Sequence, residues 1–274
     1  MLKLMYITND PAIAQIAADA GVDRIFIDME VLGKAERQGG MDTVQSHHVP
    51  EDIARVREAI GSRAEIMARV NPLNPNSQVE IDASITNGAD VIMLPMWRRA
   101  DDLRKFIQMV DGRVKTMPLL ETDTAAESLP ETVKVSGIDQ MHIGLNDLHL
   151  CYHRKFMFQL LADGTVDRLC ARLRDANIPY GFGGVGRPGS GTLPAEYIIG
   201  EHVRLGSQYV ILSRSFCNTA KITDLDEIRR IFTDGVTEIR SVEQECAAWT
   251  QEQFVENHRR VCACVEKIVK GMDT

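Results

Sequence analysis

Short apolar runs rich in β-branched residues alternate along the chain with longer segments in which hydrophobic positions recur every three or four residues. The short runs predict strands and the longer segments predict amphipathic helices. The predicted strands are residues 4–8, 24–28, 65–70, 90–94, 115–120, 140–144, 179–184 and 209–213. A predicted helix follows each strand, at residues 11–21, 50–61, 76–89, 99–112, 123–137, 163–178, 194–206 and 224–240.

This alternation determines the fold that we expect. Repeated strand–helix units imply parallel strands, and eight units at this length favour a closed (β/α)8 TIM barrel over a doubly wound open sheet. The first strand is followed by TNDP (8–11) instead of the glycine-rich turn that opens many doubly wound folds. We therefore expect an α/β barrel over residues 1–240, followed by an extra C-terminal helix in an extension over 241–274.

The charge balance narrows the class of partner. The chain has 274 residues and a formal net charge of −8. Nucleic acids and anionic membranes favour basic surfaces, so we expect neither as a partner and expect a small molecule instead. The sequence shows no apolar run of the roughly 18–20 residues that span a bilayer and no secretory signal pattern, which predicts a cytoplasmic protein. Its six cysteines lack CxxC spacing and are expected to be free thiols.

Polar residues gather where the predicted strands end, which is where barrels of this type place their reactive groups. Carboxylates crowded at one mouth repel one another unless a cation neutralises them, and oxygen ligands suit Mg²⁺ or Mn²⁺. Glu121 and Asp147 follow adjacent strands and form the best candidate pair. The alternative is that Asp147 caps a helix and Glu121 is a first-turn acid. The strand-end residues are Asn9, Asp10, Asp28, Glu30, Arg69, Asn71, Pro95, Met96, Glu121, Asn146, Asp147, Gly183, Gly184, Ser213 and Arg214.

Arg69 closes an apolar strand, where an unpaired guanidinium would be costly. It therefore needs either an anionic ligand or an internal acid. A planar carboxylate or enolate fits its fork of donors. The alternative is a structural salt bridge to Asp28 or Glu30.

Five segments in register carry a family resemblance: AQIAADAGVDRIFIDMEV (14–31), RVN (69–71), NGADVIMLPM (87–96), LLET (119–122) and IDQMHIGLNDL (138–148). Together they resemble the HpcH/HpaI aldolase and citrate lyase β-subunit family of the phosphoenolpyruvate/pyruvate-binding barrel superfamily. The resemblance covers the barrel from about residue 5 to residue 215.

The resemblance implies a divalent metal, Mg²⁺ or Mn²⁺, held by Glu121 and Asp147, with a pyruvate or enolpyruvate unit chelating it. It implies that Arg69 binds the carboxylate or enolate oxygen. It also implies that the backbone from Gly144 to Asn146, and that of Pro95 and Met96, shapes the keto-acid pocket. A homo-oligomer, a trimer or hexamer built through the C-terminal helix, is the assembly that the resemblance implies.

Two departures from the family pattern stand out. Val31 occupies the position where the resemblance implies a histidine that serves as the general base. His47 and His48 end the same loop and are candidate replacement proton carriers, although adjacent loop histidines are more often solvated. The seventh loop is rich in glycine and contains Arg187, which is suited to a phosphate or carboxylate of the substrate. The alternative is a turn or lid that contacts no anion.

The leading hypothesis is a metal-dependent class II-type aldolase, a carbon–carbon lyase. It would act on a 4-hydroxy-2-oxo acid through a pyruvate enolate, with a pyruvate- or oxaloacetate-type 2-oxo acid and an aldehyde as the small-molecule partners. None of the predicted strand ends carries a lysine, so a Schiff base is not expected. The alternatives are a citrate-lyase-like acyl-CoA lyase and a non-catalytic keto-acid-binding protein. The sequence leaves the aldehyde, the choice of metal and the direction of reaction open.

Overall fold

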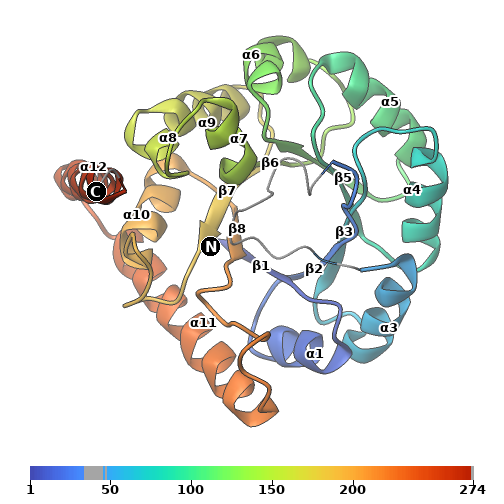
Figure 1. Ribbon diagram of the computed structural model, residues 1–274, viewed down its shortest axis with the longest axis horizontal. Helices are drawn as coiled ribbons and strands as arrows, with labels where there is room; N and C mark the ends of the chain where they lie inside the picture. Colours follow the sequence, from blue (N-terminus) through green and yellow to red (C-terminus); the bar gives the residue numbers. More distant parts are fainter. Residues whose placement is uncertain (34–45, 47, 273–274) are drawn as a thin grey trace.

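The computed structural model describes residues 1–33, 46 and 48–272. In this part of the chain, parallel strands follow one another in sequence order and close into an eight-stranded barrel (Figure 1). The expected TIM barrel is confirmed, and the doubly wound alternative is wrong because β1 pairs with β8 and closes the sheet. The strands are β1 Lys3–Ile7, β2 Arg24–Asp28, β3 Glu65–Arg69, β4 Val91–Leu94, β5 Lys115–Leu120, β6 Met141–Ile143, β7 Tyr180–Val185 and β8 Tyr209–Leu212.

The helices form a ring around the barrel (Figure 1). Two short helices that the sequence pattern missed, α7 and α8, lie between β6 and α9. Their few residues give too little periodicity to predict a helix. The helices are α1 Pro11–Asp19, α3 Pro50–Ile60, α4 Ser77–Thr86, α5 Ala100–Val110, α6 Asp123–Thr132, α7 Leu145–Cys151, α8 Gln159–Ala162, α9 Thr165–Asp175, α10 Ala195–Leu205, α11 Leu225–Ala247 and α12 Gln251–Gly271.

A local cap fixes where β5 stops and α6 starts. The Thr122 hydroxyl oxygen accepts a hydrogen bond from the backbone N–H of Ala125 at 3.1 Å, the usual N-cap interaction. The same hydroxyl donates to the backbone oxygen of Trp97 at 3.1 Å, which ties this turn to the loop after β4. Glu121 stands directly before the cap and is thereby held at the C-terminal end of the barrel.

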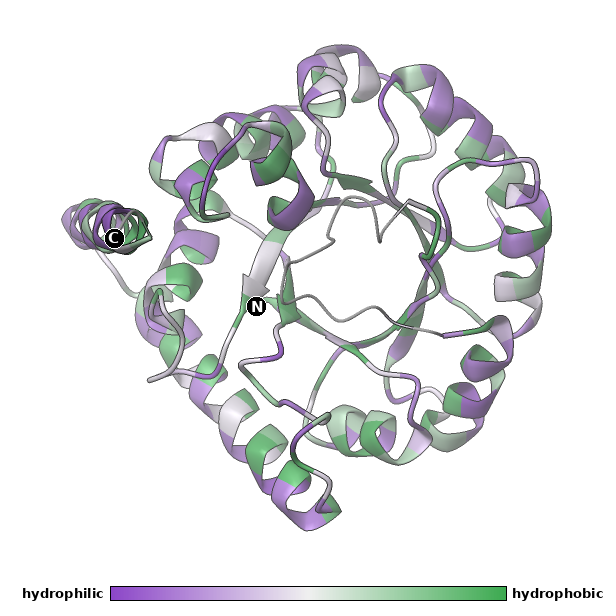
Figure 2. Ribbon diagram, viewed as in Figure 1, coloured by the Kyte–Doolittle hydropathy of each residue, from purple (hydrophilic) through white to green (hydrophobic). Residues whose placement is uncertain are grey.

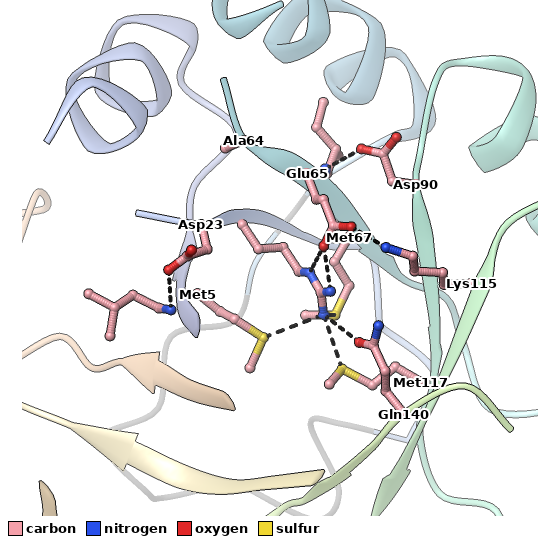
Figure 3. A network of polar contacts seen from close by, with 12 residues as sticks. Met5, Asp23, Ala64, Glu65, Met67, Asp90, Lys115, Met117 and Gln140 are labelled. Atoms are coloured by element: carbon pink, nitrogen blue, oxygen red, sulfur yellow. Dashed lines mark hydrogen bonds and ion pairs between the residues drawn. The ribbon is translucent and has the colours of Figure 1, made fainter. Parts of the chain in front are cut away.

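The barrel interior is layered, because every second residue of a strand points inward. At the N-terminal end, the buried Arg24 guanidinium donates to Glu65 at 2.6 Å and to Gln140 at 3.0 Å (Figure 3). At the C-terminal end of the same strands lie Asp28 and Arg69, which are paired in the β2–β3 register. An apolar layer separates the two charged ends and consists of Met5, Phe26, Met67, Val91, Met93, Met117, Leu119 and Tyr209.

Two long helices end the chain. The expected boundary between barrel and extension at residue 240 falls inside α11, which continues to Ala247, so the extra helix α12 begins at Gln251. α12 packs on α10 and α8 at the outside of the helix ring, with Val261 and Val265 buried (Figure 1). The strands are mostly hydrophobic, whereas the helices carry hydrophilic residues outward (Figure 2). Among the described helices, none has the length and apolar character to cross a membrane.

Candidate active site

Four carboxylates lie at the C-terminal mouth of the barrel. Asp28 ends β2, Glu30 follows it, Glu121 follows β5, and Asp147 stands in the first turn of α7 directly after β6. All four are buried, with exposed fractions of 2%, 1%, 2% and 6%, respectively. Glu121 interacts electrostatically with Asp147, Glu30 and Arg69, so the structure brings the sequence-predicted residues of adjacent strands together.

Arg69 is held by two acids. Its Nε and Nη2 donate to the two carboxylate oxygens of Asp28, each at 2.8 Å, and its Nη1 lies 3.5 Å from Glu30 Oε2. Its guanidinium carbon also lies 5.4 Å from the ring centre of Phe26. Burial alone would lower the pKa of Arg69, but the charges and hydrogen bonds of Asp28 and the charge of Glu30 raise it. The salt bridge that the sequence left as an alternative is therefore present, and it fixes a permanent cation at the mouth.

Glu121 is fixed by contacts on both sides. Its Oε1 accepts a hydrogen bond from the backbone N–H of Met96 at 3.0 Å, and Met96 adopts a left-handed backbone conformation with φ of 54°. On the other side, a Cβ on Gly144 would lie 2.9 Å from Glu121 Cβ and 3.0 Å from Oε2. Only glycine leaves this space open, so Oε2 retains room for a further contact.

The charge on Glu121 is poorly tolerated in this position. Burial, followed by the negative charges of Asp147 and Glu30, raises the pKa of Glu121 to about 8, although Arg69 and the Met96 amide oppose the shift. Such a group takes up either a proton or a metal cation at neutral pH. This site is therefore short of positive charge.

The donor set fits a hard divalent cation. Mg²⁺ is commonly held by one or two protein carboxylates, with waters and substrate oxygens completing its shell, and Glu121 and Asp147 supply such a pair. Among the residues that the structure describes, no group of three or more His, Cys, Asp or Glu side chains is placed to hold a metal. Substrate and water would have to supply the remaining ligands.

Hydrogen bonds tie described residues of the loop after β2 to the ends of β2 and β3. His48 Nδ1 accepts a hydrogen bond from the backbone N–H of Asp28 at 2.9 Å, so the proton of a neutral His48 ring sits on Nε2. Asn71 Oδ1 accepts from the backbone N–H groups of Val31 and Leu32, each at 2.9 Å, and ties the start of the loop to the end of β3. His47 lies outside the described residues.

The sequence did not predict the role of Asn71 in holding the loop after β2. It stood among the polar strand-end residues, but its part in holding the loop depends on a contact between residues 40 positions apart. Glu80 fixes it in turn, since Glu80 Oε2 accepts from the Asn71 backbone at 3.1 Å and from its side chain at 3.2 Å. The sequence held one signal for this contact. β2 and β3 are neighbouring strands, so the loops that follow them must lie close together.

Several expected substrate contacts have other partners. Arg187 donates to both oxygens of Glu238 on α11, at 2.8 and 2.6 Å, instead of joining the carboxylate group at the mouth. The Gly144 N–H donates to the Leu120 carbonyl at 2.9 Å, and the Met96 N–H is taken by Glu121. Arg187 would have to break its ion pair to bind an anion, so its role stays a prediction.

Asn146 is exposed and Pro95 is buried beside Met96. Their expected roles in the keto-acid pocket stay predictions.

A family model matches more than half of the chain. The model of the HpcH/HpaI aldolase/citrate lyase family matches residues 3–155. The chain belongs to this family of aldolases and lyases. The matched segment contains Arg69, Glu121 and Asp147, whereas Arg187 lies beyond its end.

Solved structures show the same fold at low sequence identity. An HpcH/HpaI aldolase/citrate lyase family protein from Burkholderia cenocepacia J2315 is 17% identical, with a TM-score of 0.61 over 83% of this chain and 94% of its own. An HpcH/HpaI aldolase from Desulfitobacterium hafniense DCB-2 is 14% identical, with a TM-score of 0.62 over 83% and 93%. The citrate synthase SbnG is 13% identical, with a TM-score of 0.61 over 83% and 92%. A comparison with curated proteins gave no match.

Proposed function

We propose that the protein is a metal-dependent class II-type aldolase that cleaves or forms a carbon–carbon bond in a 4-hydroxy-2-oxo acid through a pyruvate enolate. The observation that carries the proposal is the buried pair Glu121 and Asp147 beside the fixed cation Arg69. Membership of an aldolase and lyase family supports the class of reaction. The substrates would be a 2-oxo acid of the pyruvate or oxaloacetate type and an aldehyde.

In the cleavage direction, a base takes the proton of the C4 hydroxyl, the C3–C4 bond breaks, and the aldehyde leaves. The electron pair of that bond stays on the pyruvate fragment as an enolate, which then takes a proton at C3. A divalent Mg²⁺ or Mn²⁺ held by Glu121 and Asp147 would supply Lewis-acid stabilisation of the developing negative charge. Arg69 stabilises the same charge by electrostatic attraction, and Asp28 fixes its orientation beforehand.

His48 is our candidate for the proton carrier in place of the family histidine that Val31 replaces. Its bond to the Asp28 backbone holds the ring at the end of β2, next to the carboxylate that holds Arg69. In that orientation Nε2 carries the proton of the neutral ring, so His48 takes up a further proton at Nδ1, when the hydrogen bond from the Asp28 backbone opens. His47 stays a second candidate for the same role.

The assembly and the location belong to the same proposal. We expect a trimer or hexamer with residues 241–274 at the subunit interface, since α12 lies outside the ring of barrel helices (Figure 1). A cytoplasmic location stays a prediction from the sequence.

A non-catalytic keto-acid-binding protein is the second candidate, because Val31 stands where the family base is expected. Binding of pyruvate without turnover distinguishes this candidate from the first. An enzyme must move a proton at pyruvate C3, whereas a binding protein need not.

Proton NMR of pyruvate in D₂O with the purified protein tests the proposal without knowledge of the aldehyde. We expect the methyl signal to disappear with Mg²⁺ or Mn²⁺ and to persist in EDTA, because enolate formation exchanges the C3 protons. Persistence of the signal with every metal, while pyruvate still binds, would favour the non-catalytic candidate.

A further inference from the structure

The C-terminal helix α12 is attached to the barrel helices by a small apolar contact and a group of polar ones. It packs on α10 and α8 at the outside of the helix ring (Figure 1). The side chains that α12 buries fully are Asn257, Val261 and Val265, and its other apolar side chains are partly or fully exposed. Two buried valines give a modest hydrophobic stabilisation. The polar contacts of the same face therefore contribute substantially to the docking of α12.

A buried carboxylate on α10 is the centre of these polar contacts. Glu201 is completely buried, and its Oε1 accepts a hydrogen bond from the Asn257 side chain at 3.0 Å. Its Oε2 lies 2.9 Å from Nδ1 of His258. Asn257 and His258 both belong to α12, so Glu201 exchanges these two partners for water when α12 leaves α10.

Further contacts of Glu201 come from the barrel side of the interface. Arg204, on the same helix, donates to Glu201 Oε2 at 2.9 and 2.5 Å. Arg204 also pairs with Asp167 on α9 at 2.7 Å. These bonds join residues of α9 and α10, so they do not depend on the position of α12. The barrel helices thus present a fixed charged cluster, and His258 is the basic side chain with which α12 meets it.

Charged groups of two barrel helices and a thiol of α12 itself face the His258 ring. Glu201 Oε2 and Arg204 Nη2 lie 2.9 and 3.4 Å from Nδ1, and Asp167 acts on the ring through its charge. The Cys262 sulfur lies 3.6 Å from Nε2. Burial, together with the charge of Glu201, raises the pKa of Cys262, so this thiol is neutral near pH 7. The α8 segment QLLA contains no ionisable side chain.

The balance of these groups favours a protonated His258. Its hydrogen bond to Glu201 is the largest influence on the pKa of His258 and raises it, and the charges of Glu201 and Asp167 act in the same direction. Burial and the charge of Arg204 oppose the rise. The pKa of the docked ring therefore lies above the 6.5 of a solvated histidine. Its contribution to docking is fully present below pH 6.5 and is lost as the pH rises through the raised pKa.

We propose that α12 is a pH-dependent latch, in which proton uptake by His258 tightens its docking on the Glu201 cluster of α10 and proton loss loosens it. At lower pH an imidazolium faces the buried carboxylate, and the contact is an ion pair. At higher pH the neutral ring keeps one hydrogen bond to Glu201 but contributes no charge. α12 then opens more often and exposes the outer face of α10 to water. The latch acts within one chain and does not depend on the proposed aldolase activity.

Amide hydrogen exchange of the intact protein tests the proposal, measured by peptide mass spectrometry at about pH 6 and about pH 8.5 and corrected for the intrinsic effect of pH on exchange. We expect the protection of residues 251–271 to fall by about 2- to 5-fold at the higher pH, the range that a partly exposed ion pair contributes. α4, on the far side of the barrel, should keep its protection (Figure 1). The protein concentration is chosen so that sedimentation velocity gives the same mass at both pH values, which excludes a lost subunit contact.

Two variants separate the titration of His258 from simple loosening of the helix. His258→Gln can still donate to Glu201 but cannot titrate, so α12 should have the same protection at both pH values. Gly200→Ala places a Cβ 2.7 Å from Trp249 and 2.8 Å from Asn257, so it should lower the protection of α12 at both pH values and keep the difference between them. Wild-type protection that does not change with pH, an equal fall in α4 and α12, or an unchanged pH dependence in His258→Gln would overturn the latch.

Discussion

Asp28 and Arg69 are register partners on the neighbouring strands β2 and β3, and their side chains form two parallel hydrogen bonds of 2.8 Å. Both side chains are nearly buried, so each charge depends on the other. This pair fixes a planar cation at the barrel mouth before any substrate binds. The ends of β2 and β3 therefore position the cation that stabilises the enolate in the proposed reaction.

Removal of Asp28 should therefore affect both stability and activity. Asp28→Ala leaves the Arg69 charge with Glu30 at 3.5 Å, and breaking a buried ion pair costs about 3–5 kcal/mol. Urea denaturation measures the loss, and the pyruvate exchange rate should fall with it. Asp82→Ala, which breaks the exposed pair with Arg113, is the control and should change neither quantity. Equal stability of the two variants would contradict this account of the pair.

Gly144→Ala should weaken metal binding without unfolding the barrel. The added Cβ would lie 2.9 Å from Glu121 Cβ and 3.0 Å from Oε2, so the carboxylate must move. We expect a Mn²⁺ affinity at least about 10-fold lower, in the range seen when groups that orient a ligand are lost. Gly271→Ala, whose Cβ meets nothing within 4 Å, should bind Mn²⁺ normally. Wild-type affinity in Gly144→Ala would show that the position of Glu121 does not matter.

His48→Asn should slow proton exchange at pyruvate C3. Asparagine can still accept from the Asp28 backbone but cannot carry a proton, and general acid–base groups contribute about 10²–10⁴-fold to rates. The exposed His153 gives a matched control, since His153→Asn should exchange at the wild-type rate. Exchange that continues undiminished in His48→Asn would move the role to His47 or to another group.

Two buried histidines should make the protein sensitive to mild acid. Burial lowers the pKa of His142 to about 4 and that of His202 to about 3, from 6.5 in solution. Between pH 6.5 and 4 the unfolded chain protonates these two histidines and the folded chain does not, so their contribution to the free energy of unfolding falls as the pH drops through this window. Each site contributes up to about 1.4 kcal/mol per pH unit.

Urea denaturation at several pH values measures this dependence. His202→Gln should show a shallower fall in stability between pH 6.5 and 4 than the wild type, because one of the two titrating groups is gone. His153→Asn, which changes an exposed ring, should keep the wild-type slope. An identical slope in His202→Gln would mean that His202 does not titrate on unfolding.

The barrel and the heart of the site were predictable because they follow from local rules. Period-two and period-3.6 patterns define strands and helices, and the C-terminal ends of parallel strands must meet at one mouth. Glu121, Asp147 and Arg69 were identified in this way, each from its place at a strand end. Their expected roles came from the resemblance to a family. The same resemblance showed that Val31 stands where a histidine base is expected.

The rest depends on contacts between distant residues, which the patterns do not encode. Arg187 lies within a glycine-rich loop and suggested an anion site, but it pairs with Glu238, 51 residues further along on α11. Asn71 holds the loop after β2 through a hydrogen bond from Val31, which lies 40 residues earlier in the sequence. His258 and Glu201 are 57 residues apart, so their contact appears only when α12 packs on α10.

The central claim is that Glu121 and Asp147 hold the divalent metal, and Mn²⁺ titration followed by electron paramagnetic resonance tests it most directly. We expect wild-type protein and Asp123→Asn, which alters an exposed acid two residues from Glu121, to bind Mn²⁺ alike. Glu121→Gln and Asp147→Asn should each bind at least about 10-fold more weakly, since each loses a charged oxygen ligand. Unchanged Mn²⁺ affinity in both variants would place the metal elsewhere and contradict the account.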